Sequence, residues 1–363
     1  MIKQYLSSKR AIIKQSLLSF LHDQKQEAKT LECDVIDFLE GFVTDGKLYR
    51  GSLVFLGFDL FSEKKVETFK EDNGIYQLLV KLALVLELTH SALLLHDDVM
   101  DGDDYRRGNK TFNCLMSEIG EEKGIANFSH FGNSLAICLG DLLLFWSNRM
   151  LTEGLLSYSD KNVADQINQL FNHEMELTVW GQMDDVCLAA VKDQVDEELI
   201  YHLYSLKSGH YSILNPLLLG ATVAGVSKNN LQLLTALALD LGIIFQIKDD
   251  YINLFGDSSE TGKPIGSDIK ENKKTIYRNL LLDMACKTDR DKLLNLFGNH
   301  QLTEAEIDGV KQMIKKYGVV QEVEQVVTKL EKKINQNLDE LNLSANSTQL
   351  LKEFIQLIIT RDR

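Results

Sequence analysis

Two acidic side chains close a long apolar segment, LLLHDDVMDGDDYRRGN at residues 93–109. Asp97 and Asp101 are four residues apart, so on a helix they project from one face, one turn apart. Two parallel carboxylates at such a position repel each other and are costly to bury. A divalent cation removes this cost, and oxygen ligands favour Mg²⁺ or Mn²⁺ over zinc. The pair therefore predicts a divalent metal site.

A second acid pair ends another apolar segment, FQIKDDYINLFGD at residues 245–257, where Asp249 and Asn253 repeat the four-residue spacing. Both segments should be buried helices, so their acidic ends are expected to face each other at one mouth of a helical bundle, where metal sites are built. The alternative interpretation is that each acidic run is a solvated helix end in a scaffold that binds no diphosphate.

Basic residues beside glycines or acids supply the opposite charge. They occupy positions expected in loops or at helix ends: Lys47, Arg50, Arg106, Arg107, Lys207, Lys263 and Lys273. Each lysine taken singly is typical of a protein surface, but acids and cations around one cavity together indicate a Mg²⁺–diphosphate ligand. The sequence has no GxxxxGK[ST], no GxGxxG after a strand and no HExxH. A nucleoside-triphosphate cradle and a zinc site are therefore not supported.

The elements that must position these groups are helices. Apolar residues recur at helical spacing nearly everywhere, and only two of 363 residues are proline, which permits long helices. Segment 75–101 is apolar almost all round and predicts a helix buried inside a bundle. Further helices are predicted over 1–24, 133–150, 161–187, 193–210, 213–225, 229–255, 275–287, 303–317, 318–342 and 347–361. Loops are predicted at 102–111, 118–132, 226–229, 256–274 and 342–347. The pattern therefore predicts a single all-α domain over residues 1–363.

The composition argues against several classes of protein. The chain carries 39 basic and 53 acidic residues, a formal charge of −14, which argues against nucleic-acid binding and against docking on an anionic membrane. No uncharged apolar run reaches the roughly 20 residues that span a bilayer. Five widely spaced cysteines without a CxxC pair indicate reduced thiols. We therefore expect a cytoplasmic protein with no stable membrane insertion.

Seven strings occur in order along the chain: DGKLYRG (45–51), ELTHSALLLHDDVMDGDDYRRG (87–108), HFGNSLAICLGD (130–141), GQMDD (181–185), LKSG (206–209), FQIKDDYIN (245–253) and GKPIGSDIKENKKT (262–275). A DDxxD with RRG behind it, followed by FQxxDD and GKxxGxD, is highly specific. In these strings the chain resembles the trans-isoprenyl diphosphate synthases, the polyprenyl synthetases that make farnesyl and geranylgeranyl diphosphate. The resemblance implies an isoprenoid-synthase bundle around a central hydrophobic tunnel, and a homodimer.

The resemblance also implies a role for individual residues. Asp97 and Asp101 would hold two Mg²⁺ ions and Asp249 a third, with Mn²⁺ as an expected substitute. The allylic diphosphate would be gripped by Arg106, Lys207 and Lys263. Isopentenyl diphosphate would be bound by Lys47, Arg50, His90 and Arg107. Ser208 and Gln246 would line the reacting centre. Supporting roles would fall to Asp185 beside Lys207, to Lys273 at the closing loop, and to Arg361 and Arg363 near the homoallylic diphosphate.

In such an enzyme, ionisation of the allylic diphosphate leaves a cation that the double bond of isopentenyl diphosphate attacks. Product length would be set by the tunnel below Asp97, which is lined by Leu93, Ala92 and Thr89. Bulky aromatic residues at the first two positions stop the family's products at farnesyl length, and neither is aromatic here. We therefore predict geranylgeranyl diphosphate, with farnesyl or longer polyprenyl diphosphates as alternatives.

Some residues depart from the family pattern. Asn253 stands where many members have aspartate, Ser208 replaces the commoner threonine, and segment 115–129 looks longer than usual. Two other classes of protein also fit part of the pattern. A class I terpene cyclase would need no isopentenyl pocket, and a non-catalytic subunit of a prenyl synthase would have lost one aspartate motif.

Overall fold

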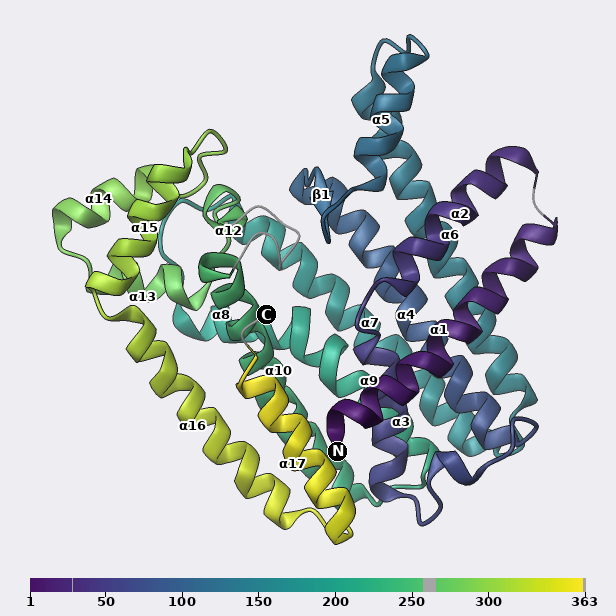
Figure 1. Ribbon diagram of the computed structural model, residues 1–363. Helices are drawn as coiled ribbons and strands as arrows, with labels where there is room; N and C mark the ends of the chain where they lie inside the picture. Colours follow the sequence, from purple (N-terminus) through teal and green to yellow (C-terminus); the bar gives the residue numbers. More distant parts are fainter. Residues whose placement is uncertain (28, 257–265, 362–363) are drawn as a thin grey trace.

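The computed structural model describes residues 1–27, 29–256 and 266–361, and within them it confirms the all-α prediction (Figure 1). The α-helices are α1 (Ile2–Glu27), α2 (Thr30–Thr44), α3 (Tyr49–Phe61), α4 (Gly74–Asp101), α5 (Phe112–Glu122), α6 (Phe128–Ser157), α7 (Lys161–Ala189), α8 (Glu197–Tyr204), α9 (Asn215–Val223), α10 (Lys228–Phe255), α12 (Ser267–Lys270), α13 (Ile276–Met284), α14 (Lys287–Leu296), α15 (Glu304–Lys316), α16 (Val319–Glu340) and α17 (Ala345–Ile359). A 3₁₀ turn, η1 (Val66–Thr68), a π-helix, η2 (Ser205–Leu214), and a hairpin of β1 (Tyr105–Arg106) and β2 (Asn109–Lys110) complete the described elements.

Helix α4 carries the first acid pair and is buried along most of its length. The Asn73 side chain caps its start by accepting from two backbone N–H groups, and Gly102 ends it in the left-handed conformation. Its apolar surface packs mainly against α6 and α3. The predicted helix over 75–101 is therefore confirmed, and the acid pair lies at its carboxyl end.

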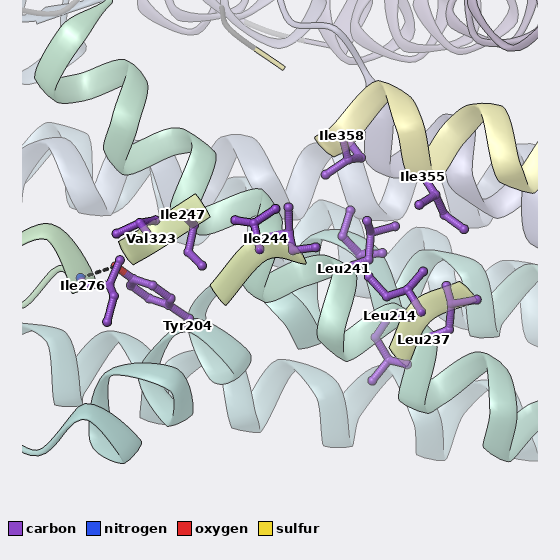
Figure 2. Close-up of a cluster of buried hydrophobic side chains, with 14 of the residues drawn as sticks. Tyr204, Leu214, Leu237, Leu241, Ile244, Ile247, Ile276, Val323, Ile355 and Ile358 are labelled. Carbon is purple, nitrogen blue, oxygen red and sulfur yellow. Dashed lines mark hydrogen bonds between the residues drawn. The ribbon is translucent and has the colours of Figure 1, made fainter. Parts of the chain in front are cut away.

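Buried apolar side chains form two clusters that share three helices. One cluster joins α10 to α13, α15, α16 and α17 (part of it is drawn in Figure 2), and the other joins α2, α4 and α6. Helices α1, α3 and α9 contribute to both, through residues such as Leu53 and Phe55 on α3. These three helices thus connect the two clusters.

The π-helix η2 lies tightly against α10. A Cβ added to Gly242 of α10 would lie 2.2 Å from the Cα of Gly209 in η2, so only glycine permits this approach. Pro216 directly follows η2, where its missing N–H disturbs the ordinary i→i−4 ladder. The close contact brings Lys207 and Ser208 of η2 beside the second acid-bearing helix.

Part of the loop prediction was wrong. Residues 118–122 belong to α5 and residues 128–132 to α6, within the predicted loop 118–132. The glycines in this segment serve helix packing, because a Cβ on Gly132 would lie 2.2 Å from the carbonyl oxygen of Asn113. Residues 105–110 form a short hairpin within the predicted loop 102–111.

Among the described residues, three helices are long and apolar enough to cross a membrane by length and composition alone: α4, α6 and α10. The buried share of the most apolar window is 72% in α4, 44% in α10 and only 28% in α6. The expectation of no stable membrane insertion therefore stays a prediction. What the burial does show is that α6 exposes an unusually apolar face.

Candidate functional site

The carboxylates at the end of α4 are surrounded by cations and amides. Asp97 accepts from the Gln182 amide at 3.0 Å and lies 3.6 Å from Arg106 and 3.8 Å from Lys207. Burial and the charge of Asp97 raise the pKa of Asp101, against the opposing effect of nearby lysines. A raised pKa means that an added cation would stabilise the ionised pair.

Arg106 is held on the neighbouring carboxylate of Asp98, which is buried on the other side of α4. The guanidinium Nε donates to the Asp98 Oδ1 at 2.5 Å, and Asp103 lies 3.6 Å away. Asp98 thus anchors Arg106 beside Asp97.

Two lysines converge on one buried acid of α7. Asp185 accepts from Lys207 at 2.6 Å and from Lys273 at 3.0 Å, and Lys273 also donates to Asp101 at 2.8 Å. Although burial alone would raise the pKa of Asp185, the two ammonium groups bring it below its ordinary value. The predicted support of Lys207 by Asp185 is present, and the structure adds Lys273 as a second partner.

The second acid-bearing helix, α10, presents Asp249 to an arginine. Arg361, which follows α17, places its Nη1 2.6 Å from the Asp249 carboxylate and stacks its guanidinium on the Phe245 ring at 4.6 Å. Burial raises the pKa of Asp249, and Arg361 opposes this. Asn253 instead contacts Ser267, whose hydroxyl accepts from its amide at 2.8 Å. Lys263 and Arg363 lie outside the described residues.

Ser208 and Gln246, both predicted to line the reacting centre, contact each other. The Ser208 hydroxyl donates to the Gln246 carbonyl oxygen, and the Gln246 amide donates to Asp250 at 2.8 Å. Both side chains come from elements held together by the Gly209–Gly242 contact. Asp250 was missed by sequence reasoning, because adjacent aspartates give no indication of which one points inward.

The predicted isopentenyl pocket gathers around Arg50. Its Nη2 donates to Ser212 at 2.7 Å and its guanidinium lies 4.6 Å from the Tyr211 ring, which in turn is 6.0 Å from the His90 ring. Burial, with Arg50 and Arg107 nearby, holds the pKa of His90 well below its ordinary value, so the imidazole is neutral. The buried Tyr211 hydroxyl has no hydrogen-bond partner among the described residues, which fits a pocket that awaits a polar ligand.

Lys47 lies just before α3, and Arg107 lies in the turn between β1 and β2. Lys47 lines a cavity of about 590 Å³ together with Tyr49 and Arg361. Arg107 has a left-handed backbone, with φ of 52°, and donates to the Phe42 carbonyl at 3.4 Å. Burial and the charge of Arg106 lower the pKa of Arg107. The four residues assigned to isopentenyl diphosphate thus belong to α4, α3 and the two segments beside them.

The residues predicted to set product length lie on α4 below Asp97. Ala92 and Thr89 are buried, while Leu93 is half-buried. The Thr89 hydroxyl is 2.7 Å from the Ser147 hydroxyl of α6, and both oxygens bond to the Val85 carbonyl. Ser147 was missed, since nothing local marks the residue of α6 that faces Thr89.

The donor set fits Mg²⁺ bound together with a phosphate. Within residues 1–27, 29–256 and 266–361, no three His, Cys, Asp or Glu side chains form a metal-binding group. Mg²⁺ is commonly held by one or two carboxylates plus substrate phosphates and water, rather than by an all-protein cage. Asp97 and Asp101 on α4, and Asp249 on α10, match that partial shell.

The chain is similar to a known family over most of its length. The family model described as Polyprenyl synthetase matches residues 35–316. A geranylgeranyl diphosphate synthase of Sulfolobus acidocaldarius is 29% identical over 279 residues, covering 77% of this chain and 76% of that protein. A farnesyl pyrophosphate synthase of Saccharomyces cerevisiae is 29% identical over 301 residues, covering 80% of this chain and 79% of that protein.

The fold is similar to solved structures over the whole chain. A geranylgeranyl pyrophosphate synthase from Corynebacterium glutamicum, complexed with isoprenyl diphosphate and magnesium, gives a TM-score of 0.89 at 26% identity and covers 100% of both chains. A farnesyl diphosphate synthase from T. Brucei gives a TM-score of 0.78 at 18% identity, again covering 100% of both chains, and supports the fold alone.

Proposed function

The chain belongs to the polyprenyl synthetase family, and from this premise we propose that it is a prenyltransferase that joins isopentenyl diphosphate head to tail to an allylic prenyl diphosphate. One observation carries the proposal. Lys207 lies 3.8 Å from Asp97 of α4, and its neighbour Ser208 bonds to Gln246 of α10, which bonds in turn to Asp250, so carboxylates from two helices and a cation lie around one site. Acids to hold metal and cations to hold phosphate are both needed for a metal diphosphate.

The proposed roles of the residues follow from their contacts. Asp97 and Asp101 would hold two Mg²⁺ ions and Asp249 a third, and the bound metal would supply Lewis-acid neutralisation of the leaving diphosphate. Arg106 and Lys207 grip the allylic diphosphate, and the family resemblance assigns the same role to Lys263, which lies outside the described residues. Lys273 donates to both Asp101 and Asp185, and from this position its ammonium group can bind a phosphate oxygen of the same substrate.

The two reactants are oriented by different parts of the site. Lys47, Arg50, Arg107 and the neutral His90 bind isopentenyl diphosphate. The allylic C–O bond breaks and the diphosphate leaves with the electron pair, while oxygen dipoles of Ser208 and Gln246 stabilise the cation in a site that excludes water. The double bond of isopentenyl diphosphate then attacks the cation. A proton passes to the departing diphosphate, and the chain is five carbons longer.

We propose geranylgeranyl diphosphate as the main product. Ala92 is small at the position where an aromatic side chain would shorten the product, and several relatives with similar coverage are named geranylgeranyl diphosphate synthases. Incubation with Mg²⁺, isopentenyl diphosphate and each allylic primer, followed by product chromatography, tests this. A farnesyl product alone would overturn the chain length. A cyclic hydrocarbon would indicate a terpene cyclase, and no turnover would overturn the activity.

We further propose that the enzyme is a cytoplasmic homodimer that meets its copy through α6 and α7. Nine large side chains in the described parts of these two adjacent helices are both apolar and exposed: Phe128, Ile137, Leu142, Phe145, Leu156, Val179, Trp180, Met183 and Val186. Phe145 is 74% and Trp180 59% exposed, so leaving this surface in water is unfavourable. A second copy supplies a matching apolar surface, as in most symmetric dimers.

A further inference from the structure

A continuous chain of hydrogen bonds leads from the backbone of α13 to the proposed reacting centre. The Ile276 N–H donates to the Tyr204 hydroxyl at 2.8 Å, and that hydroxyl donates to the Asp250 Oδ2. On its other oxygen, Asp250 accepts from the Gln246 amide at 2.8 Å, and the Gln246 carbonyl accepts from Ser208. Figure 2 shows the first of these bonds, with the Tyr204 ring among the buried side chains of Ile247, Ile276 and Val323.

The donor and acceptor of each hydrogen bond in this series follow from the groups at Tyr204 and Asp250. A backbone N–H can only donate, so Tyr204 must accept from Ile276 and use its own proton toward Asp250. Asp250 accepts from the Tyr204 hydroxyl on Oδ2 and from the Gln246 NH₂ on Oδ1, so Gln246 turns its NH₂ toward Asp250. The Gln246 carbonyl oxygen therefore faces Ser208 and accepts a hydrogen bond from the Ser208 hydroxyl.

This orientation matters electrostatically. A carbonyl oxygen and the lone pairs of a hydroxyl stabilise an adjacent carbocation, whereas an amide NH₂ turned the other way would repel it. Tyr204 is 4% and Asp250 3% exposed, so neither contacts substrate from the surface, and water cannot replace a lost bond in the chain.

We propose that Tyr204 and Asp250 are positioning residues that hold the Gln246 amide in the one orientation that stabilises the allylic cation. The inference rests on the proposed function, since it needs a cation to form beside Ser208 and Gln246. Nothing in the short sequence motifs marks Tyr204, which lies 46 residues before Asp250 in the chain.

The test compares Tyr204→Phe with Tyr201→Phe. Both substitutions remove one hydroxyl from α8, but Tyr201 bonds only to Glu197 of the same helix, at 2.7 Å. We expect Tyr204→Phe to lower kcat by about tenfold to a hundredfold, with the KM for both diphosphates within about threefold of wild type, because binding groups are untouched. Tyr201→Phe should keep wild-type kcat. A raised KM with unchanged kcat in Tyr204→Phe overturns the proposal. Equal kcat for the two variants also overturns it.

A double variant separates positioning from general damage. If Tyr204 acts through Gln246, adding Tyr204→Phe to Gln246→Leu lowers kcat no further than Gln246→Leu alone. Independent, multiplicative losses would contradict the proposal.

If Tyr204→Phe does not fold, Asp250→Asn provides a second test of the same proposal. Tyr204 and Gln246 donate to different oxygens of Asp250, and asparagine replaces one of these oxygens with an NH₂ group that cannot accept, so kcat should again fall with KM preserved. Wild-type kcat in a folded Asp250→Asn protein overturns the inference. Wild type without turnover overturns the proposed function and this inference together. Wild-type turnover with an unaffected Tyr204→Phe overturns only the inference.

Discussion

The contact between Gly209 of η2 and Gly242 of α10 makes a sharp prediction for Gly242→Ala. The added Cβ would lie 2.2 Å from the Gly209 Cα, whereas ordinary contacts begin near 3.4 Å. The two helices must therefore separate by about 1 Å, because both contacting atoms are fixed to backbone. Such a shift moves Ser208 away from Gln246, which lies one turn along from residue 242.

The matched control is Gly309→Ala in α15, where an added Cβ meets no atom within 4 Å. Both variants gain the same helix propensity, about 1 kcal/mol, so the difference between their unfolding free energies isolates the overpacking cost of about 1–3 kcal/mol. We expect Gly309→Ala to be more stable than wild type, and Gly242→Ala to be less stable than Gly309→Ala by that amount.

The activity of the same pair of variants tests the link from packing to chemistry. A displacement of 1 Å at reacting groups costs up to about a hundredfold in rate, so Gly242→Ala should lose most of its kcat while Gly309→Ala keeps the wild-type value. Denaturant melts and steady-state kinetics on both proteins supply the measurements. A Gly242→Ala enzyme as stable and as active as Gly309→Ala would refute the reasoning.

Four further predictions follow from separate contacts. Ala92→Phe should shorten the product toward farnesyl length by filling the tunnel, and an unchanged chromatogram would place the tunnel elsewhere. Arg361→Ala should lower the Mg²⁺ concentration needed to bind a diphosphate analogue, measured by calorimetry, because it removes the cation 2.6 Å from Asp249; a higher requirement would contradict this. Phe145→Glu on α6 should convert a dimer to monomers in sedimentation. A dimer that persists in this variant would show that the exposed face is not the interface. Burial lowers the pKa of Lys274 to about 7, so the folded state binds fewer protons than the unfolded state above pH 7. The free energy of unfolding of wild type relative to Lys274→Met should therefore rise from pH 7 to about 10, and a flat difference would refute the low pKa.

The helices and the first acid pair could be predicted from sequence because their signals are local. Helical spacing over 75–101 and a four-residue gap between Asp97 and Asp101 need no tertiary information. The loop prediction at 118–132 was partly wrong because it, too, used only local signals. Local sequence gives no sign of helix packing, and Gly132 serves the packing of α5 against α6.

The remaining site contacts depend on residues that are far apart in the chain. Thr89 meets Ser147 across 58 residues, and Arg361 reaches Asp249 from beyond α17. Only the folded arrangement of helices decides which hydroxyl or carboxylate faces inward. Tyr204 is the clearest case, since its importance comes from one backbone N–H on α13.

The central claim is tested most directly by product analysis of the purified protein with Mg²⁺, isopentenyl diphosphate and farnesyl diphosphate, using Asp97→Asn as the matched control. Loss of the Asp97 carboxylate should greatly reduce turnover and leave the helical circular dichroism unchanged, because Asp97 contacts only polar groups at the end of α4 in the described contacts. The account predicts an all-trans twenty-carbon diphosphate from wild type and almost none from Asp97→Asn. A cyclic product, no product, or equal turnover by the two proteins would contradict it.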